Sequence, residues 1–104
     1  MYNIKYRVDV DKWGDVMVFN KTVLKNKSGL HARPASLLVE LANKFKSEVF
    51  IKKGNMTINA KSIMGVMTLG AARGTEIIIE VDGSDEEEAL KAIIELIDSN
   101  FNEE

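Results

Sequence analysis

The spacing of apolar and polar residues divides the chain into segments that alternate between strand-like and helix-like patterns. Four segments are strand-like, Val18–Leu24, Glu48–Lys53, Met56–Ala60 and Thr75–Val81. In the last segment, Ile77, Ile79 and Val81 share one face of the predicted strand. Gly54-Asn55 separates the second and third segments and predicts a two-residue hairpin turn.

Three other segments have the spacing of amphipathic helices. The first begins close to His31, because Pro34 has no N–H and is tolerated only in the first turn of a helix. A short second helix is predicted after Ser62, over Ile63–Met67. Ser84-Asp85-Glu86-Glu87 has the pattern of a capping box and introduces the third helix. The apolar stripe of that helix consists of Leu90, Ile93, Ile94, Ile97 and Phe101.

The resulting order of elements is β-α-β-β-α-β-α. Alternating strands have one apolar face, which amphipathic helices can cover. We therefore predict an α+β fold. It is an open-faced sandwich in which a four-stranded, mainly antiparallel sheet is covered on one face by three helices.

Composition excludes several classes of site. The chain of 104 residues has no cysteine and one histidine, so disulfides and multi-histidine or thiolate metal sites are excluded, and no cofactor is predicted. Residues 17–81 carry ten Lys/Arg and four Asp/Glu, a net charge of +6, whereas residues 82–104 carry one Lys and nine Asp/Glu, a net charge of −8. The plainer interpretation of this asymmetry is a solvated acidic helix and tail. The alternative is a basic working surface that attracts acidic protein partners and phosphate. With no apolar run able to span a bilayer, we expect a cytoplasmic domain.

His31 is the candidate for chemistry. Taken alone, it reads as an ordinary surface or helix-capping histidine. Its neighbours favour a second interpretation, because the start of a helix exposes N–H groups that bind anions. The helix start at Ala32-Arg33 thus supplies two backbone donors, and the Arg33 guanidinium adds a fork suited to phosphate oxygens. A free ring nitrogen of His31 could attack phosphorus, and the same donors could hold the transferred group.

Two motifs carry a resemblance to a known family. Ser28-Gly29-Leu30-His31-Ala32-Arg33-Pro34-Ala35 resembles the active-site signature of HPr, the histidine-containing phosphocarrier family of the bacterial sugar phosphotransferase system. Lys61-Ser62-Ile63-Met64-Gly65-Val66-Met67 resembles the regulatory-serine segment of the Gram-positive members. The order and spacing of the motifs also agree with that family, from about Met17 to the C-terminus.

The resemblance implies a phosphoryl carrier rather than an enzyme. His31 would accept phosphate through Nδ1 from Enzyme I, which draws it from phosphoenolpyruvate, and would donate it to sugar-specific IIA components. Arg33 would support the transfer. The resemblance also implies the open-faced fold already predicted. We expect a monomer, with no nucleic-acid partner because the net charge is −2, and with no direct insertion into a membrane because no apolar run is long enough.

Ser62 has two interpretations. The plainer one is a helix N-cap, with the apolar residues after it in the core. A short helix cannot bury all of these residues, however, and methionine is common on adaptable binding surfaces. The resemblance implies that Ile63, Met64 and Met67 form a partner docking patch. It also implies that HPr kinase/phosphorylase modifies Ser62, and that this form joins catabolite control protein A as a corepressor.

Met1–Val16 departs from the family, whose chains begin near the position of Met17. Lys5–Val10 alternates like an edge strand, which favours a genuine extension. Trp13-Gly14-Asp15 back-translates to a purine-rich run just upstream of the Met17 codon, which favours a start codon assigned too far upstream. We prefer the second interpretation, and expect a weakly packed segment if it is expressed. Residues 17–104 form the predicted phosphocarrier domain.

Two other functions compete with the phosphocarrier. One is a Crh-like corepressor acting through Ser62; the Crh-type paralogues lack the phosphorylatable histidine, so His31 argues against it. The other is a ferredoxin-like nucleic-acid binder. The acidic charge and the lack of an evident set of stacking aromatic residues argue against that function.

Overall fold

The computed structural model of the chain describes residues 5–9 and 15–102, with side chains described from Met17 onward. One sheet has the strand order β1-β2-β5-β3-β4, and each neighbouring pair is antiparallel. Its strands are β1 (Lys5–Asp9), β2 (Asp15–Val23), β3 (Glu48–Lys53), β4 (Met56–Asn59) and β5 (Glu76–Asp82). β2 to β5 correspond to the four strands predicted from the sequence.

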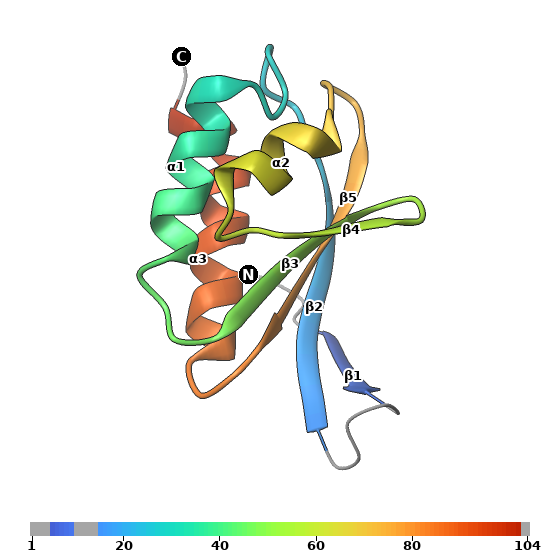
Figure 1. The fold of residues 1–104 in the computed structure, drawn as a ribbon, viewed down its shortest axis with the longest axis vertical. Coiled ribbons are helices and arrows are strands. Elements are labelled where there is room, and N and C mark those ends of the chain that lie inside the picture. The colour runs from blue at the N-terminus through green and yellow to red at the C-terminus, as the bar shows by residue number, and fades with distance from the viewer. Residues whose placement is uncertain (1–4, 10–14, 103–104) are drawn as a thin grey trace.

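The helices all lie on one face of this sheet (Figure 1). They are α1 (Ala32–Ala42), α2 (Ile63–Leu69) and α3 (Glu86–Asp98), and a short 3-10 turn, η1 (Asn100–Asn102), follows α3. The predicted α+β open-faced sandwich, with three helices on one face of an antiparallel sheet, is confirmed.

The sheet has five strands rather than four, because part of the N-terminal segment joins it. β1 pairs with the first half of β2, from Lys5 opposite Phe19 to Asp9 opposite Asp15. An edge strand leaves a row of backbone N–H and C=O groups unpaired, and an alternating segment can satisfy them. This pairing agrees with the edge-strand interpretation of Lys5–Val10, of which Val10 lies outside the described residues.

The core lies between the sheet and the helices. Ile77, Ile79 and Val81 of β5 are fully buried, as the alternating pattern predicts. The helices bury their predicted apolar stripes against these residues. The fully or nearly fully buried helical residues are Ala35, Leu38, Ala42, Val66, Leu69, Ala89, Leu90, Ile93, Ile94 and Ile97.

Glu80 lies on the opposite face of β5, yet it is only 6% exposed. The strand register pairs it with Phe19 on β2 and with Phe50 on β3, so a cross-strand neighbour lies on either side of it. Lys52 on the neighbouring strand brings its Nζ to 3.9 Å from Glu80 Oε2. The period-two pattern places Glu80 on the correct face but does not predict its burial.

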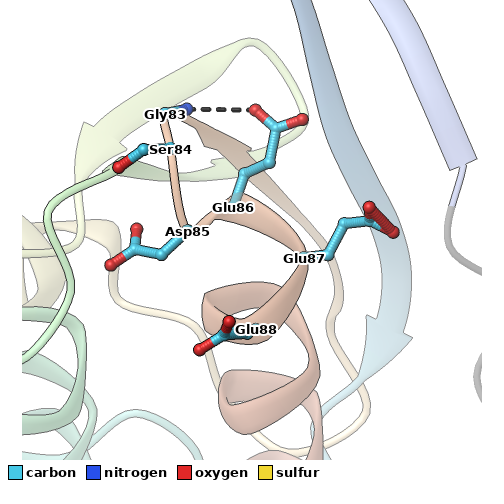
Figure 2. Close-up of a pocket in the computed structure, with 6 residues that line it drawn as sticks. All are labelled: Gly83, Ser84, Asp85, Glu86, Glu87 and Glu88. Atoms are coloured by element: carbon cyan, nitrogen blue, oxygen red, sulfur yellow. Dashed lines mark hydrogen bonds between the residues drawn. The ribbon is translucent and has the colours of Figure 1, made fainter.

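The start of α3 differs from the predicted capping box. The helix begins at Glu86, with Asp85 as N-cap, and Gly83 N donates to Glu86 Oε1 at 3.0 Å (Figure 2). Asp85 makes no side-chain capping bond within α3. Its carboxylate instead accepts hydrogen bonds from the segment that precedes β3. These bonds come from Lys46 N at 2.9 Å, from Ser47 N at 2.9 Å and from the Ser47 hydroxyl. The Asp85 carboxylate thus makes a tertiary contact with residues 46–47 instead of a capping bond within its own helix.

The Asp85 contact predicts a pH dependence of folding stability. The Ser47 hydroxyl and the Lys46 N–H lower the pKa of Asp85 from 3.8 to about 2. Since a lowered pKa stabilises the folded state only while the group is ionised, this contribution is complete above about pH 4. It is lost as the pH falls from about 4 through 2.

We expect wild type to exceed Asp85→Asn in urea midpoint at pH 7 and the gap to close near pH 2. Glu88→Gln, which removes an exposed carboxylate from the same helix, is the control and should show a much smaller gap at every pH. A gap between wild type and Asp85→Asn that is as large at pH 2 as at pH 7 would contradict this account.

Candidate functional site at the start of α1

His31 is the N-cap of α1 and lies exposed on the surface. Its backbone is extended, with φ −79° and ψ −177°, and its carbonyl accepts the first helical hydrogen bond from Ala35 N at 2.8 Å. The imidazole makes no capping hydrogen bond. The backbone of His31 therefore serves the helix, while its ring is left available to an incoming group.

The first turn of α1 is arranged to receive an anion. Pro34 has no N–H, and the N–H of Ala35 is already used by His31, so Ala32 and Arg33 carry the orphan donors of the helix start. The first turn contains no acidic residue. The Arg33 side chain is exposed and makes no ion pair within residues 15–102. Two backbone donors and one guanidinium are thus free beside His31.

The loop before His31 is held against the segment that follows α2. Leu30 N donates to Ala71 O at 2.8 Å, and Gly29 has φ +63°. A Cβ at Gly29 would lie 2.5 Å from Ala71 O, so only glycine fits this approach. A hollow of about 340 Å³ opens at this junction; it is lined by Ser28, Leu30, His31, Met67, Gly70, Ala71 and Ala72.

α2 presents apolar side chains to solvent next to this hollow. Val66 and Leu69 face the core, whereas Ile63 and Met67 are each 41% exposed and Met64 is 75% exposed. These three residues are the predicted docking patch. Met67 is the member that lines the hollow together with His31. A seven-residue helix packed on α1 cannot turn all of its apolar residues inward.

Ser62 is the N-cap of α2, and its Oγ accepts a hydrogen bond from Gly65 N at 3.1 Å. The residue before it, Lys61, accepts at its carbonyl from Asn43 Nδ2 at 3.2 Å. Asn43 is the C-cap of α1. Ser62 therefore lies beside the C-terminal end of α1, while the other end of α2, at Met67 and Gly70, reaches His31.

A second hollow, of about 240 Å³, lies at the start of α3 and is lined by residues 83–88. In Figure 1 this end of α3 is at the lower end of the helical layer, and the start of α1 is at the upper end. The four carboxylates of this hollow point in different directions (Figure 2). Within the described part of the chain, no group of three or more His, Asp or Glu residues could hold a metal ion. Among the same residues, no helix has the length and apolar character needed to cross a membrane.

An exposed histidine at a helix start, with free backbone donors and an arginine two residues later, is the arrangement expected of a histidine phosphocarrier domain. The family model for the HPr component of the phosphotransferase system, described as "PTS HPr component phosphorylation site", matches residues 19–99. The chain belongs to the HPr family of phosphocarrier proteins, which are carriers and not enzymes.

Curated relatives include both branches of this family. The phosphocarrier protein HPr of Neisseria meningitidis is 50% identical over 78 residues, which are 75% of this chain and 88% of that protein. The HPr-like protein Crh of Halalkalibacterium halodurans is 48% identical over 82 residues, which are 79% and 98% of the two chains. Sequence identity alone therefore does not separate the two branches.

Solved structures agree with the fold. HPr-C-His from Thermoanaerobacter tengcongensis has a TM-score of 0.81 and 50% identity, and covers 83% of this chain and 97% of its own. A structure described as an HPr dimer from the same bacterium has a TM-score of 0.68 and 51% identity, and covers 79% and 94% of the two chains. The expected monomeric state of the present protein therefore stays a prediction.

Proposed function

We propose that His31 carries a phosphoryl group from phosphorylated Enzyme I to sugar-specific IIA components. In the first step Nδ1 of His31 attacks phosphorus, so that an N–P bond forms as the bond between phosphorus and Enzyme I breaks. In the second step the IIA component attacks the same phosphorus, and the histidine leaves. The exposed, unbonded ring of His31 at the start of α1 is the observation that supports this function.

The surroundings of His31 suit an intermediate that must be both stabilised and released. The N–H groups of Ala32 and Arg33 and the Arg33 guanidinium can donate to the phosphoryl oxygens. All of these groups are at the surface, so a partner can reach the phosphorus in line with the bond that breaks. The exposed patch of Ile63, Met64 and Met67 offers that partner an apolar contact next to His31. We place this activity in residues 17–104 and in the cytoplasm.

The direct test is incubation of the full chain with Enzyme I and phosphoenolpyruvate, followed by intact-mass measurement. We expect one added phosphoryl group, which is lost in acid and retained in base, as a phosphohistidine requires. A subsequent incubation with a IIA component should return the chain to its original mass. No mass gain with an Enzyme I that labels a known HPr would reject the proposed function.

We further propose that phosphorylation of Ser62 regulates docking. A phosphate adds about −1.5 to −2 charges at neutral pH and would sit next to Ile63 and Met64. Partner docking must bury these side chains, and a phosphate beside them resists loss of its water. Ser62 and Met67 are five residues apart along the chain, or about 7.5 Å along the helix axis. The charge would therefore lie within the docking surface, at the end of α2 away from the hollow at His31. HPr kinase/phosphorylase and catabolite control protein A are the partners proposed for this form.

Substitutions at Ser62 separate its charge from its capping role. Asp and Asn both keep an N-cap acceptor for Gly65 N, but only Asp is charged. We expect Ser62→Asp to raise the KM for Enzyme I-dependent phosphorylation several-fold, and Ser62→Asn to match wild type. Ser62→Ala should lose about 0.5–2 kcal/mol of folding stability and stay a competent acceptor. Equal KM values for the Asp and Asn variants would refute the charge-based account.

A Crh-like corepressor is the second candidate function. The 48% identity with Crh of Halalkalibacterium halodurans, nearly equal to the identity with HPr, favours keeping it. His31 distinguishes the two functions, because a corepressor that acts through Ser62 has no need of a phosphorylatable histidine. Failure of Enzyme I to label the chain, together with efficient labelling of Ser62 by the kinase, would favour the corepressor.

A further inference from the structure

Asn26 is a buried polar residue in the loop that leads to His31. It is 2% exposed, and its Nδ2 donates to Gly29 O at 2.8 Å. Gly29 N donates in turn to Asn26 O at 3.2 Å. The turn over residues 26–29 is therefore closed twice, once by the backbone and once by the Asn26 side chain.

The side-chain bond fixes one particular peptide unit. The Gly29–Leu30 peptide is held at its oxygen by Asn26 Nδ2 and at its N–H by Ala71 O, at 2.8 Å in both cases. Leu30 is 4% exposed and anchored in the core, and His31 is the next residue along the chain. Rotation of the Gly29–Leu30 peptide would change the direction in which the chain enters α1, and with it the direction of the imidazole.

Asn26 is a poor choice if stability alone matters. Its Oδ1 is buried and has no hydrogen-bond partner within the described residues. An unpaired buried acceptor weakens folding, and a leucine of nearly the same shape would avoid that cost. The amide cannot be turned over to relieve it, because Oδ1 would then face the carbonyl oxygen of Gly29. Asparagine at this position is explained by its N–H donor and not by its contribution to packing.

We infer that Asn26 is a positioning residue for phosphoryl transfer, which orients His31 through the Gly29–Leu30 peptide. This inference rests on the proposed function of His31. Transfer needs the attacking nitrogen in line with the bond that breaks, and a misplacement of about 1 Å can slow such a step about a hundredfold. Loss of the Asn26 donor would let the peptide rotate and spread the ring over several directions.

The test compares substitutions at Asn26 with a matched control at Asn43. Asn43 also donates its side-chain N–H groups to backbone carbonyls, at 2.9 Å to Val39 O and at 3.2 Å to Lys61 O, but it lies at the opposite end of α1. Asn26→Leu keeps the side-chain shape without the donor, and Asn26→Ala removes both. Phosphorylation of the full chain by Enzyme I and phosphoenolpyruvate is measured well below the lowest Tm of the set.

We expect both Asn26 variants to lose at least tenfold in kcat with a smaller change in KM, and Asn43→Ala to stay within twofold of wild type even if its Tm is lower. The His31 ring resonances in an NMR spectrum should broaden or shift in the Asn26 variants only. Wild-type kcat in folded Asn26→Leu, or an equal loss in Asn43→Ala, would overturn the inference. Failure of both Asn26 variants to fold would also overturn it, by making Asn26 a folding residue. An unlabelled wild type would instead reject the proposed function itself.

Discussion

Replacing His31 by Ala is expected to abolish acid-labile phosphorylation by Enzyme I while leaving the fold intact. His31 is the only histidine of the chain, and the chain has no cysteine, so no other imidazole or thiol can accept the group. Its ring makes no capping bond, and the carbonyl that starts α1 is kept by any residue. Intact-mass measurement after labelling should show no added phosphoryl group, with an unchanged circular dichroism spectrum.

The matched control for His31→Ala is Ser36→Ala. Ser36 is an exposed hydroxyl-bearing residue of α1, one turn further along the helix, and its loss should leave labelling unchanged. Persistent acid-labile labelling of His31→Ala would place the acceptor elsewhere and refute the assignment. A labelled product that survives acid would point to a hydroxyl acceptor instead, such as Ser62.

The parts of the fold that the sequence predicts are those with strong local patterns. Alternation in β5 and the helical stripe that begins at Leu90 each bury one face. β5 lies within one residue of its expected ends, whereas α3 ends at Asp98, three residues before Phe101, the last member of the predicted stripe. Pro34 places the start of α1, and Gly54 the turn of the β3–β4 hairpin. At these positions the local conformational preference of the residues favours the same structure as the burial of their apolar side chains, so the local sequence is enough to predict it.

The parts that escape prediction depend on contacts between distant segments. Asp85 leaves its own helix to bind Ser47, 38 residues away, so the expected capping box does not form. The burial of Glu80 depends on strands β2 and β3, whose register no local pattern gives. Phe101 is buried in a turn with φ +57°, a left-handed conformation unusual for a bulky residue, and the helical stripe predicts only its burial.

In the candidate site, too, some residues are predicted from local motifs and others depend on contacts between distant segments. His31, Arg33 and Ser62 are identified by short motifs, and their roles stay predictions until phosphorylation is measured. The relation of Ser62 to His31 is not visible in those motifs, because it depends on the direction in which α2 packs on α1. Asn26 is missed altogether. An asparagine in a turn-rich loop is common, and only the structure shows that it is buried and bonded to the peptide before His31.

Arg33→Ala is expected to slow transfer to and from His31 strongly while barely changing stability. During transfer, negative charge passes over the three phosphoryl oxygens, and a well-placed donor stabilises it by about 2–4 kcal/mol. This corresponds to a rate loss between about 30-fold and 1000-fold. In the free protein the exposed guanidinium interacts mainly with water. Once a partner covers the site and excludes that water, the same group acts at closer to full strength.

Comparison of Arg33→Ala with two further variants, Arg33→Lys and Lys91→Ala, separates the effect of the guanidinium donors from that of positive charge alone. Arg33→Lys keeps the positive charge but loses the planar pair of donors, and should fall between wild type and Arg33→Ala. Lys91→Ala removes one positive charge from the exposed face of α3 and should transfer like wild type. Rapid-quench measurement of single-turnover rates with phosphorylated Enzyme I gives the transfer step directly. Because the Arg33 side chain makes no ion pair within residues 15–102, the Tm of Arg33→Lys and of Arg33→Ala should differ little from that of wild type. Wild-type single-turnover rates in Arg33→Ala would show that the N–H groups at the start of α1 suffice to stabilise the passing phosphoryl group.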